Sequence, residues 1–425
     1  MPAYAEYKDS SEGWISEIPE HWELKKLKHI FYEKKHKANM NLNCGSISFG
    51  KVIKKDDDRV THATKASYQE VLEGEFLINP LNLNYDLISL RIALSKMDVV
   101  VSAGYIVLKP RVKTVKGYYK YLLHRYDVAF MKLLGSGVRQ TISFNHIANS
   151  ILIAPPIPEQ TAIAEFLDEK TSKIEALVKI KQQQIETLAE RKQILIQNAT
   201  TRGLVSDVPM KDSGIDWIGA VPAHWTCPKL KLVCKFVLDG THGSFPRVEN
   251  GYRLLAVRNI IDNEFVFRAN DSFVSYRHFK EISSKFLIRE GDIQLAIVGA
   301  TLGKVAVVGK LDEDFVTQRS VSTIRVNDKC INYFAAYYMR SSAFQSYLWN
   351  NAEFSAQPGV YLNTVQNAYI PLPDIDEQIL IVKFIDKESK KIDAAITIKQ
   401  NQITKLNEYK TTLINAAVTG KIKVI

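Results

Sequence analysis

Two short stretches of the chain contain residue types that occur in nucleotide-binding or catalytic sites. The run GATLGKV, from Gly299 to Val305, is rich in glycine and could hold a phosphate group through its backbone N–H groups. It has one residue too few between its glycines for a phosphate-binding loop, and no Ser or Thr follows Lys304. The second stretch, LDEK (residues 167–170), resembles the acidic–lysine signature of some nucleases, but it lies in a helical repeat where a solvated face is expected. We therefore expect neither stretch to be catalytic.

The remaining candidates for chemistry are isolated. His21 and His224 each stand alone between a proline-containing turn and a tryptophan, which favours packing or helix capping over metal binding. The cysteines form no C-x-x-C pair and indicate a reducing, cytoplasmic location; they are Cys44, Cys227, Cys234 and Cys330. The sequence has no leader-like start and no run of the roughly 20 apolar residues that a membrane span needs. It predicts a non-catalytic protein without a metal site, a cofactor or a membrane segment.

One nine-residue motif occurs twice. WISEIPEHW (14–22) and WIGAVPAHW (217–225) share Trp, Ile, Pro, His and Trp at matching offsets, and KDS precedes each copy at 8–10 and 211–213. The chain has only five tryptophans, so four at equivalent places indicate an internal duplication.

A longer repeat follows each copy. Residues 157–201 align without gaps to 375–419, with 21 identities in 45 positions. Prolines precede or open both stretches, and beyond Pro158 neither contains Pro or Gly until Gly203 and Gly420. Because good helix formers dominate between these limits, the sequence predicts two long helices, each a rod of ~65 Å.

Apolar residues recur every seven positions in both helices, which predicts a coiled-coil seam. The seam residues are Leu167, Ile174, Val178, Lys181, Ile185, Leu188 and Leu195 in the first helix, and Ile385, Ile392, Ile396, Lys399, Ile403, Leu406 and Leu413 in the second. Polar exceptions fall at the same positions of both copies. We expect an antiparallel coiled coil within one chain, with Lys192 near Ser389 and Lys410 near Thr171. In the alternative, each helix packs separately on its own block.

The segments between the repeats differ in sequence and indicate a mixed α/β fold. Residues 99–109 and 292–308 are rich in Val and Ile and predict strands, whereas the aromatic stretches 118–134 and 332–349 predict core helices. The expected architecture is two globular domains, each followed by a long helix, with pseudo-two-fold symmetry. The predicted boundaries are 1–156, 157–203, 204–372 and 373–425.

The net charge of +10 suggests a polyanionic partner. Residues 24–156 hold 21 basic and 10 acidic residues, a net charge of +11, whereas residues 226–374 hold 17 and 14, a net charge of +3. Most of the excess therefore belongs to the first block.

The repeated motifs identify a family. The chain resembles the specificity subunit of type I restriction–modification systems over essentially all of its 425 residues. The resemblance depends on IPEHW and VPAHW, each followed by K-L-K, and on PPIPEQTAIAEFLD and PLPDIDEQILIVKFID, which lead into helices that end in TRGL and VTGKI. DGTHGSFP (239–246), VSAGY (101–105) and GDIQLAIVGATLGKVAVV are also typical of its variable blocks.

The resemblance implies that each block is a target recognition domain that reads one half of a split, asymmetric double-stranded DNA sequence. It implies two methyltransferase subunits as partners, which carry S-adenosylmethionine and methylate adenine, and two restriction subunits, which use ATP and magnesium. No cofactor is expected on this chain. An alternative function is a coiled-coil DNA-bridging scaffold with no methyltransferase partner.

The candidate DNA-binding residues are chosen by side-chain chemistry, because Arg suits guanine edges and phosphates and Asn or Gln suits adenine edges. In the first block they are Lys51, Lys54, Lys55, Arg59, Lys65, Arg91, Arg139 and Gln140. In the second block they are Thr241, His242, Arg247, Arg258, Asn259, Lys304, Gln318, Arg319 and Gln357.

Overall fold

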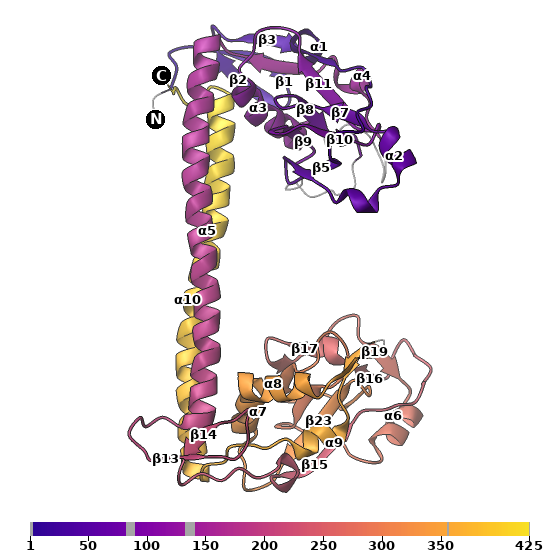
Figure 1. Ribbon diagram of the computed structural model, residues 1–425, viewed down its shortest axis with the longest axis vertical. Helices are drawn as coiled ribbons and strands as arrows, with labels where there is room; N and C mark the ends of the chain where they lie inside the picture. The colour runs from indigo at the N-terminus through magenta and orange to yellow at the C-terminus, as the bar shows by residue number, and fades with distance from the viewer. Residues whose placement is uncertain (1–2, 82–89, 132–140, 355–356, 425) are drawn as a thin grey trace. The chain divides into compact units, whose positions relative to one another are not determined.

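The computed structural model describes residues 3–81, 90–131, 141–354 and 357–424, except for the side chain of Arg59. The chain divides into two compact units (Figure 1). Unit 1 comprises residues 1–182 and 401–425, and unit 2 comprises residues 183–400. Each unit therefore contains one variable block and part of each long helix. Among the described residues no helix has the length and apolarity to cross a membrane.

Unit 1 is built on a four-stranded antiparallel sheet with the order β4-β11-β8-β9, next to which lies helix α3 (Lys116–Ala129). These strands are β4 (Phe31–Glu33), β8 (Phe76–Ile78), β9 (Ile92–Leu94) and β11 (Ile106–Pro110). Two-stranded pairs surround the sheet: β1 (Tyr7–Glu12) with β2 (Ile15–Pro19), β3 (Glu23–Lys26) with β12 (Ile151–Ala154), β5 (Gly45–Ser48) with β6 (Lys51–Lys54), and β7 (Gln69–Val71) with β10 (Val99–Val101). The short helices are α1 (Leu27–Ile30), α2 (His62–Ala66) and α4 (Phe144–Ile147).

Unit 2 is built on a six-stranded mixed sheet with the order β15-β23-β20-β21-β18-β17. These strands are β15 (Cys234–Asp239), β17 (Ile260–Ile261), β18 (Glu264–Phe265), β20 (Ile293–Ala296), β21 (Val305–Val307) and β23 (Val321–Val326). A second sheet joins β16 (Tyr252–Leu255), β19 (Ser272–Val274) and β22 (Phe315–Thr317), and two hairpins pair β13 (Met210–Asp212) with β14 (Ala220–Pro222) and β24 (Glu353–Phe354) with β25 (Pro358–Gly359). The helices are α6 (Tyr276–Ser283), α7 (Asn332–Arg340), α8 (Ser342–Asn350) and α9 (Leu362–Asn367).

The predicted strands are confirmed, and both aromatic stretches are mainly helical, although residues 132–134 of the first lie outside the described residues. The run at 99–109 forms β10 and β11, and the run at 292–308 forms β20 and β21. The aromatic stretch of unit 2 forms two helices instead of one, because Ser341 adopts an extended conformation and its hydroxyl caps α8. The aromatic side chains of α3, α7 and α8 are largely core residues; Tyr118, Tyr119, Tyr126, Phe334, Tyr338 and Phe344 are all buried.

The two long helices are α5 (Ile157–Arg202) and α10 (Ile375–Val418). In unit 1 the start of α5 packs against the end of α10, where Leu167 shares a buried cluster with Leu413. In unit 2 the end of α5 packs against the start of α10, where Ile196 shares a cluster with Ile385. Within each unit the helices therefore run antiparallel, as the coiled-coil prediction requires.

Burial along the helices follows the predicted seam. All 14 predicted seam positions are buried or half-buried, including Lys181 and Lys399, whereas most of the neighbouring helical positions are exposed. The 3.5-residue spacing of apolar side chains is therefore what selects the inner face.

The partners of the seam lysines differ from the prediction by one helical turn. In unit 2 the Lys192 ammonium lies 2.7 Å from a carboxylate oxygen of Asp393, four residues beyond Ser389. In unit 1 Lys410 lies 2.6 Å from Glu175, four residues beyond Thr171. The long lysine side chains extend to a carboxylate one turn further along the opposite helix, because a charged acceptor binds an ammonium more strongly than a hydroxyl does.

Candidate nucleic-acid interface

The repeated His–Trp motif of unit 1 holds the first turn of α5. The Trp22 indole nitrogen donates to one carboxylate oxygen of Glu159 at 2.9 Å, and His21 Nε2 lies 2.6 Å from the other. The Tyr4 hydroxyl also donates to Glu159, at 2.7 Å. Burial raises the pKa of Glu159, but the hydrogen bonds from Tyr4, Trp22 and His21 outweigh it and leave this pKa below its ordinary value. The carboxylate is therefore held ionised at the positive end of the helix.

Unit 2 repeats this arrangement at the first turn of α10. The Trp225 indole nitrogen donates to Glu377 at 3.0 Å, and His224 Nε2 lies 2.9 Å from the same oxygen. Trp22 and Trp225 are both fully buried. Both histidines thus have a structural role, as predicted, but their partner is a helix-terminal glutamate, which the sequence patterns did not indicate.

Each tryptophan also packs on the glycine that ends the other long helix. Gly420 ends α10 with φ +74°, and a Cβ atom there would lie 3.1 Å from Trp22 and would overlap the ring of Pro19. Gly203 ends α5 with φ +75°, and a Cβ atom there would lie 3.3 Å from Trp225. In each unit one indole therefore joins the start of one long helix to the end of the other.

The glutamine that follows Glu159 or Glu377 connects the variable block of its unit to the start of the same long helix. Gln160 accepts from Val115 N at 3.1 Å, just before α3, and donates to the Pro155 carbonyl at 2.8 Å. Gln378 accepts from Ile331 N at 2.7 Å, just before α7, and donates to the Pro373 carbonyl at 2.9 Å. We call the His–Trp–Glu–Gln set of each unit its clamp. Its residues recur in the sequence, because HW and EQ are each found at equivalent places in both copies, but the sequence did not indicate that they pair with each other.

In unit 2 five of the predicted DNA-binding residues lie close together. Thr241 bridges to Gln318, with Arg319 N donating to the Thr241 carbonyl at 3.0 Å. His242, Arg319 and Gln357 line one open cavity of about 640 Å³, between the loop after β15 and the β24–β25 hairpin. Asp239 also lines the cavity, and its carboxylate is hydrogen-bonded to the His242 ring. Exposed Arg and Gln side chains at the edge of such a groove are the donors and acceptors that base edges and phosphates require.

The other predicted residues of unit 2 divide into exposed and buried ones. Arg247, Arg258 and Lys304 are exposed, although Arg258 also donates to the Asn270 carbonyl at 2.7 Å. Asn259 is fully buried, and its amide donates to the Val266 carbonyl and to Asp271, both at 2.9 Å. The burial of Asn259 argues against a DNA contact, because its amide stabilises a turn inside the unit.

In unit 1, Lys51, Lys54 and Lys55 are exposed on or just after strand β6. Lys65 is half-buried and pairs with Asp57 at 2.7 Å. Arg91 is only 6% exposed, and its Nε lies 3.0 Å from Asp127, which is fully buried. Arg91 is therefore a core ion-pair residue, and its burial argues against the predicted contact with DNA. The side chain of Arg59, together with Arg139 and Gln140, lies outside the described residues.

Each unit has an isolated β-bridge just after a strand of its main sheet. In unit 1 Thr141 forms a bridge to Leu81, which follows β8, and in unit 2 Gly359 forms a bridge to Val298, which follows β20. Short helices, α4 and α9, come next. Thr141 and Gly359 are therefore in comparable positions, each bridged to a residue that follows a strand of the main sheet.

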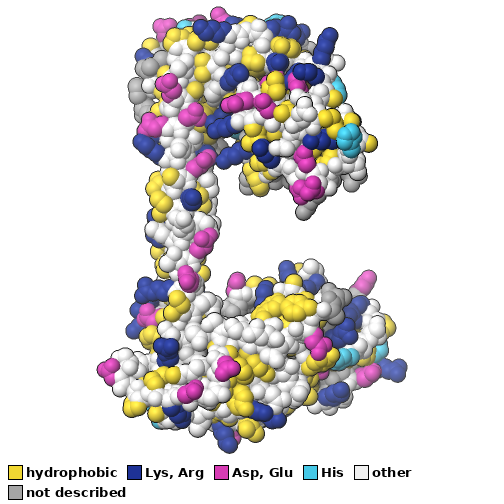
Figure 2. Space-filling view, in the orientation of Figure 1, with side chains coloured by type: hydrophobic (Ala, Val, Ile, Leu, Met, Phe, Trp, Pro, Cys, Tyr) yellow, Lys and Arg dark blue, Asp and Glu magenta, His cyan; other side chains and the backbone are white. Residues whose placement is uncertain are grey.

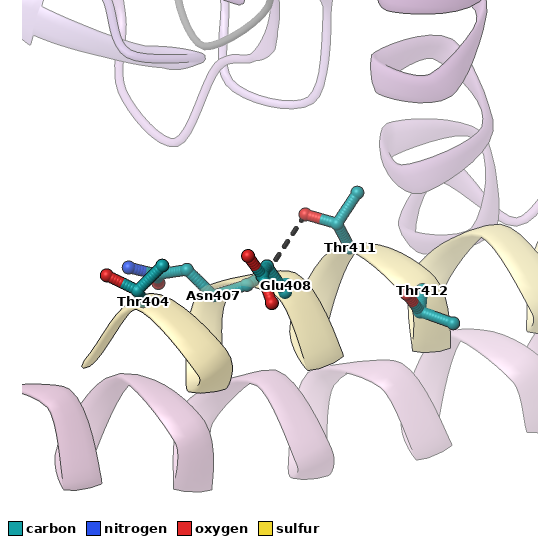
Figure 3. Close-up of a pocket in the computed structure, with 5 residues that line it drawn as sticks. All are labelled: Thr404, Asn407, Glu408, Thr411 and Thr412. Atoms are coloured by element: carbon teal, nitrogen blue, oxygen red, sulfur yellow. Dashed lines mark hydrogen bonds between the residues drawn. The ribbon is translucent and has the colours of Figure 1, made fainter. Parts of the chain in front are cut away.

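A second depression lies on α10 within unit 1 and is lined by Thr404, Asn407, Glu408, Thr411 and Thr412 (Figure 3). The Thr411 hydroxyl donates back to the Asn407 carbonyl at 3.0 Å. The Thr411 hydroxyl is therefore engaged within its own helix. Among the described residues no group of three or more His, Cys, Asp and Glu side chains could hold a metal ion.

The model of the type I restriction modification DNA specificity domain matches the chain twice, at residues 19–187 and 249–408. The chain belongs to this family. Each match includes most of one variable block and the clamp glutamate that follows it, Glu159 in the first and Glu377 in the second. The chain therefore contains two copies of one specificity domain, each with a clamp glutamate.

Curated relatives agree with the family. The specificity subunit of the type I restriction enzyme MjaVIII of Methanocaldococcus jannaschii is 26% identical over 76% of this chain and 75% of its own length. The MjaX specificity subunit of the same organism, described as putative, is 24% identical over 96% of both chains. The EcoBI specificity subunit of Escherichia coli is 24% identical over 66% of this chain and 60% of its own.

Solved structures show the same fold. A chain from a study of assembly and conformational transition of the type I R-M system superimposes with a TM-score of 0.70 at 14% identity, over 95% of this chain and 99% of that one. The HsdS subunit of Thermoanaerobacter tengcongensis gives a TM-score of 0.52 at 15% identity, over 95% and 98%.

Proposed function

We propose that this specificity subunit reads a bipartite, asymmetric DNA target, one part with each block, and that it has no catalytic activity of its own. The observation that supports this most strongly is the pair of clamps. They attach two blocks of different sequence to the long helices through the same four residue types and nearly the same distances. Two similar attachments that carry two blocks of different sequence suit a DNA target whose two parts differ.

The chemistry of unit 2 fits this proposal. Its groove presents Arg319, Gln357 and His242 beside Thr241, and these side chains can bind base edges and phosphates in a major groove. Unit 1 presents exposed lysines instead, which bind phosphates without reading sequence.

The proposal includes two methyltransferase subunits as partners, which carry S-adenosylmethionine, and two restriction subunits, which use ATP and magnesium. The helices offer apolar surface for docking, and Figure 2 shows hydrophobic side chains between charged ones along them. Ile180 in unit 1 and Ile398 in unit 2 occupy equivalent repeat positions and are 47% and 55% exposed. Duplicated exposed positions suit two copies of one partner.

The test is to co-express the chain with its methyltransferase subunit and map methylated adenines in the host DNA. The proposal predicts co-purification and a motif of two short parts separated by unspecified bases. A continuous motif would contradict the two-reader model. DNA binding without any methyltransferase partner would support the alternative of a DNA-bridging scaffold.

A further inference from the structure

The β5–β6 hairpin of unit 1 carries an exposed aromatic side chain at its tip. Ser48 pairs with Lys51, so Phe49 and Gly50 alone form the turn. Phe49 is 72% exposed, more than any other described large hydrophobic residue except Phe354. A phenylalanine at a hairpin tip contributes little to folding when most of its surface remains in water.

The backbone at this tip is strained. Phe49 has φ +45° and Gly50 has φ +69°, which are the two positive angles of a type I′ turn. Asn-Gly is the preferred pair for such a turn, because Asn tolerates the left-handed region and a bulky side chain does not. Among the described non-glycine residues with positive φ, Phe49 is the only large apolar one. Phe49 therefore adds neither buried apolar surface nor a favourable backbone conformation to the folded state. This points to a role other than stabilising the fold.

The hairpin is held rigidly. Val52 is buried, and the hairpin base is fixed by bonds from Lys55 N to the Cys44 carbonyl at 2.8 Å and from Cys44 N to Asp57 at 2.7 Å. At the turn, a Cβ atom on Gly50 would lie 2.9 Å from Leu90, so the turn backbone rests against that residue. The tip is thus presented on a fixed support.

Cations follow the aromatic side chain along the strand. Lys51, Lys54 and Lys55 are exposed, and among the described residues none of the three forms an ion pair. The neighbouring Asp57 is already engaged by Lys65. An apolar tip beside exposed ammonium groups suits duplex DNA, because the lysines bind phosphates while the ring contacts bases.

We propose that Phe49 is a wedge that inserts at a base step of the DNA bound by unit 1, unstacking it while Lys51, Lys54 and Lys55 hold the flanking phosphates. The proposal rests on the proposed DNA-binding function. It assigns this tip a part in recognition through DNA deformability, in contrast to the hydrogen-bonding groove of unit 2.

The test uses the full chain with its methyltransferase partner and two duplexes, one with the mapped target and one unrelated. The variant Phe49→Asn restores the preferred turn pair and removes the ring. We expect its melting temperature to equal or exceed that of wild type, while the Kd for target DNA rises at least about 5-fold. The loss should be the same at low and high salt, because stacking releases no counterions. Ile53→Ala, on the same hairpin and 42% exposed, is the matched control and should leave the Kd unchanged.

A second variant reports on stacking directly. Phe49→Trp should bind target DNA as wild type does, and the emission of the added indole should be quenched on binding. An unchanged Kd for Phe49→Asn, an unquenched indole, a lower melting temperature for Phe49→Asn, or loss of methyltransferase co-purification would each overturn the wedge while wild type still binds DNA. If wild type binds neither duplex, the proposed function fails together with it.

Discussion

Units 1 and 2 share a frame and differ in the surface they present. The clamps have matching residues: His21, Trp22 and Glu159 in unit 1 correspond to His224, Trp225 and Glu377 in unit 2. The presented surfaces have little in common. Unit 1 offers lysines and a strained aromatic tip, whereas unit 2 offers a groove with Arg, Gln and His. Duplication therefore kept the attachment chemistry and left the reading surface free to diverge.

The clamp tryptophans should give the largest effects. Trp22→Ala and Trp225→Ala each remove a fully buried indole and its hydrogen bond to a glutamate, and we expect each to lower the free energy of unfolding by ~3–5 kcal/mol. Urea unfolding followed by circular dichroism measures this. Trp349→Ala, at a 37% exposed position, is the control and should cost much less. A small effect in one unit alone would show that the clamps are not equivalent.

Breaking the buried Arg91–Asp127 pair should separate stability from recognition. Because Arg91→Ala removes the guanidinium that pairs with the fully buried Asp127 carboxylate, we expect a loss of ~3–5 kcal/mol in the free energy of unfolding. At temperatures where the variant stays folded, its DNA affinity should match that of wild type. Weakened DNA binding by a fully folded Arg91→Ala would restore the prediction that this residue contacts DNA.

Glu159→Gln tests the electrostatic part of the unit 1 clamp. The folded pKa of Glu159 is lowered, so its contribution is present above the pKa of the unfolded chain, near 4.5, and is lost as pH falls through the folded pKa. We expect Glu159→Gln to cost ~1–3 kcal/mol at pH 7 and less at pH 3. Unfolding curves at several pH values measure it, and a cost that grows toward acid pH would contradict the assignment.

The groove and the lysines should differ in how they weaken DNA binding. Replacing Lys51, Lys54 and Lys55 with Ala should reduce the slope of log K against log salt by ~0.9 for each phosphate that is no longer neutralised, equally for all sequences. Arg319→Ala should instead cost ~1–3 kcal/mol of binding to the target and less on unrelated DNA. Anisotropy titrations at several salt concentrations measure both. If the two variants lost affinity for target DNA relative to unrelated DNA by the same factor, the proposed difference in DNA binding between the units would be contradicted.

The frame could be predicted from the sequence because it is periodic and duplicated. Heptad spacing was sufficient to locate the seam, and the repeated Trp motif located the clamps, although not their glutamate partners. The reading surface was harder to predict, because residue type does not determine burial. Arg91 and Asn259 have the side chains of DNA-binding residues, but Asp127 and Asp271 hold them inside the fold. Phe49 was missed because a positive φ at an aromatic residue is visible only in three dimensions.

The central claim is that two independent readers share one repeated frame. The most direct test is to map methylated adenines in cells that express the methyltransferase with either wild type or the Arg319→Ala, Gln357→Ala double variant of unit 2. The account predicts a two-part motif for wild type, and relaxed specificity in one part only for the variant. A continuous wild-type motif, or equal relaxation of both parts in the variant, would contradict it.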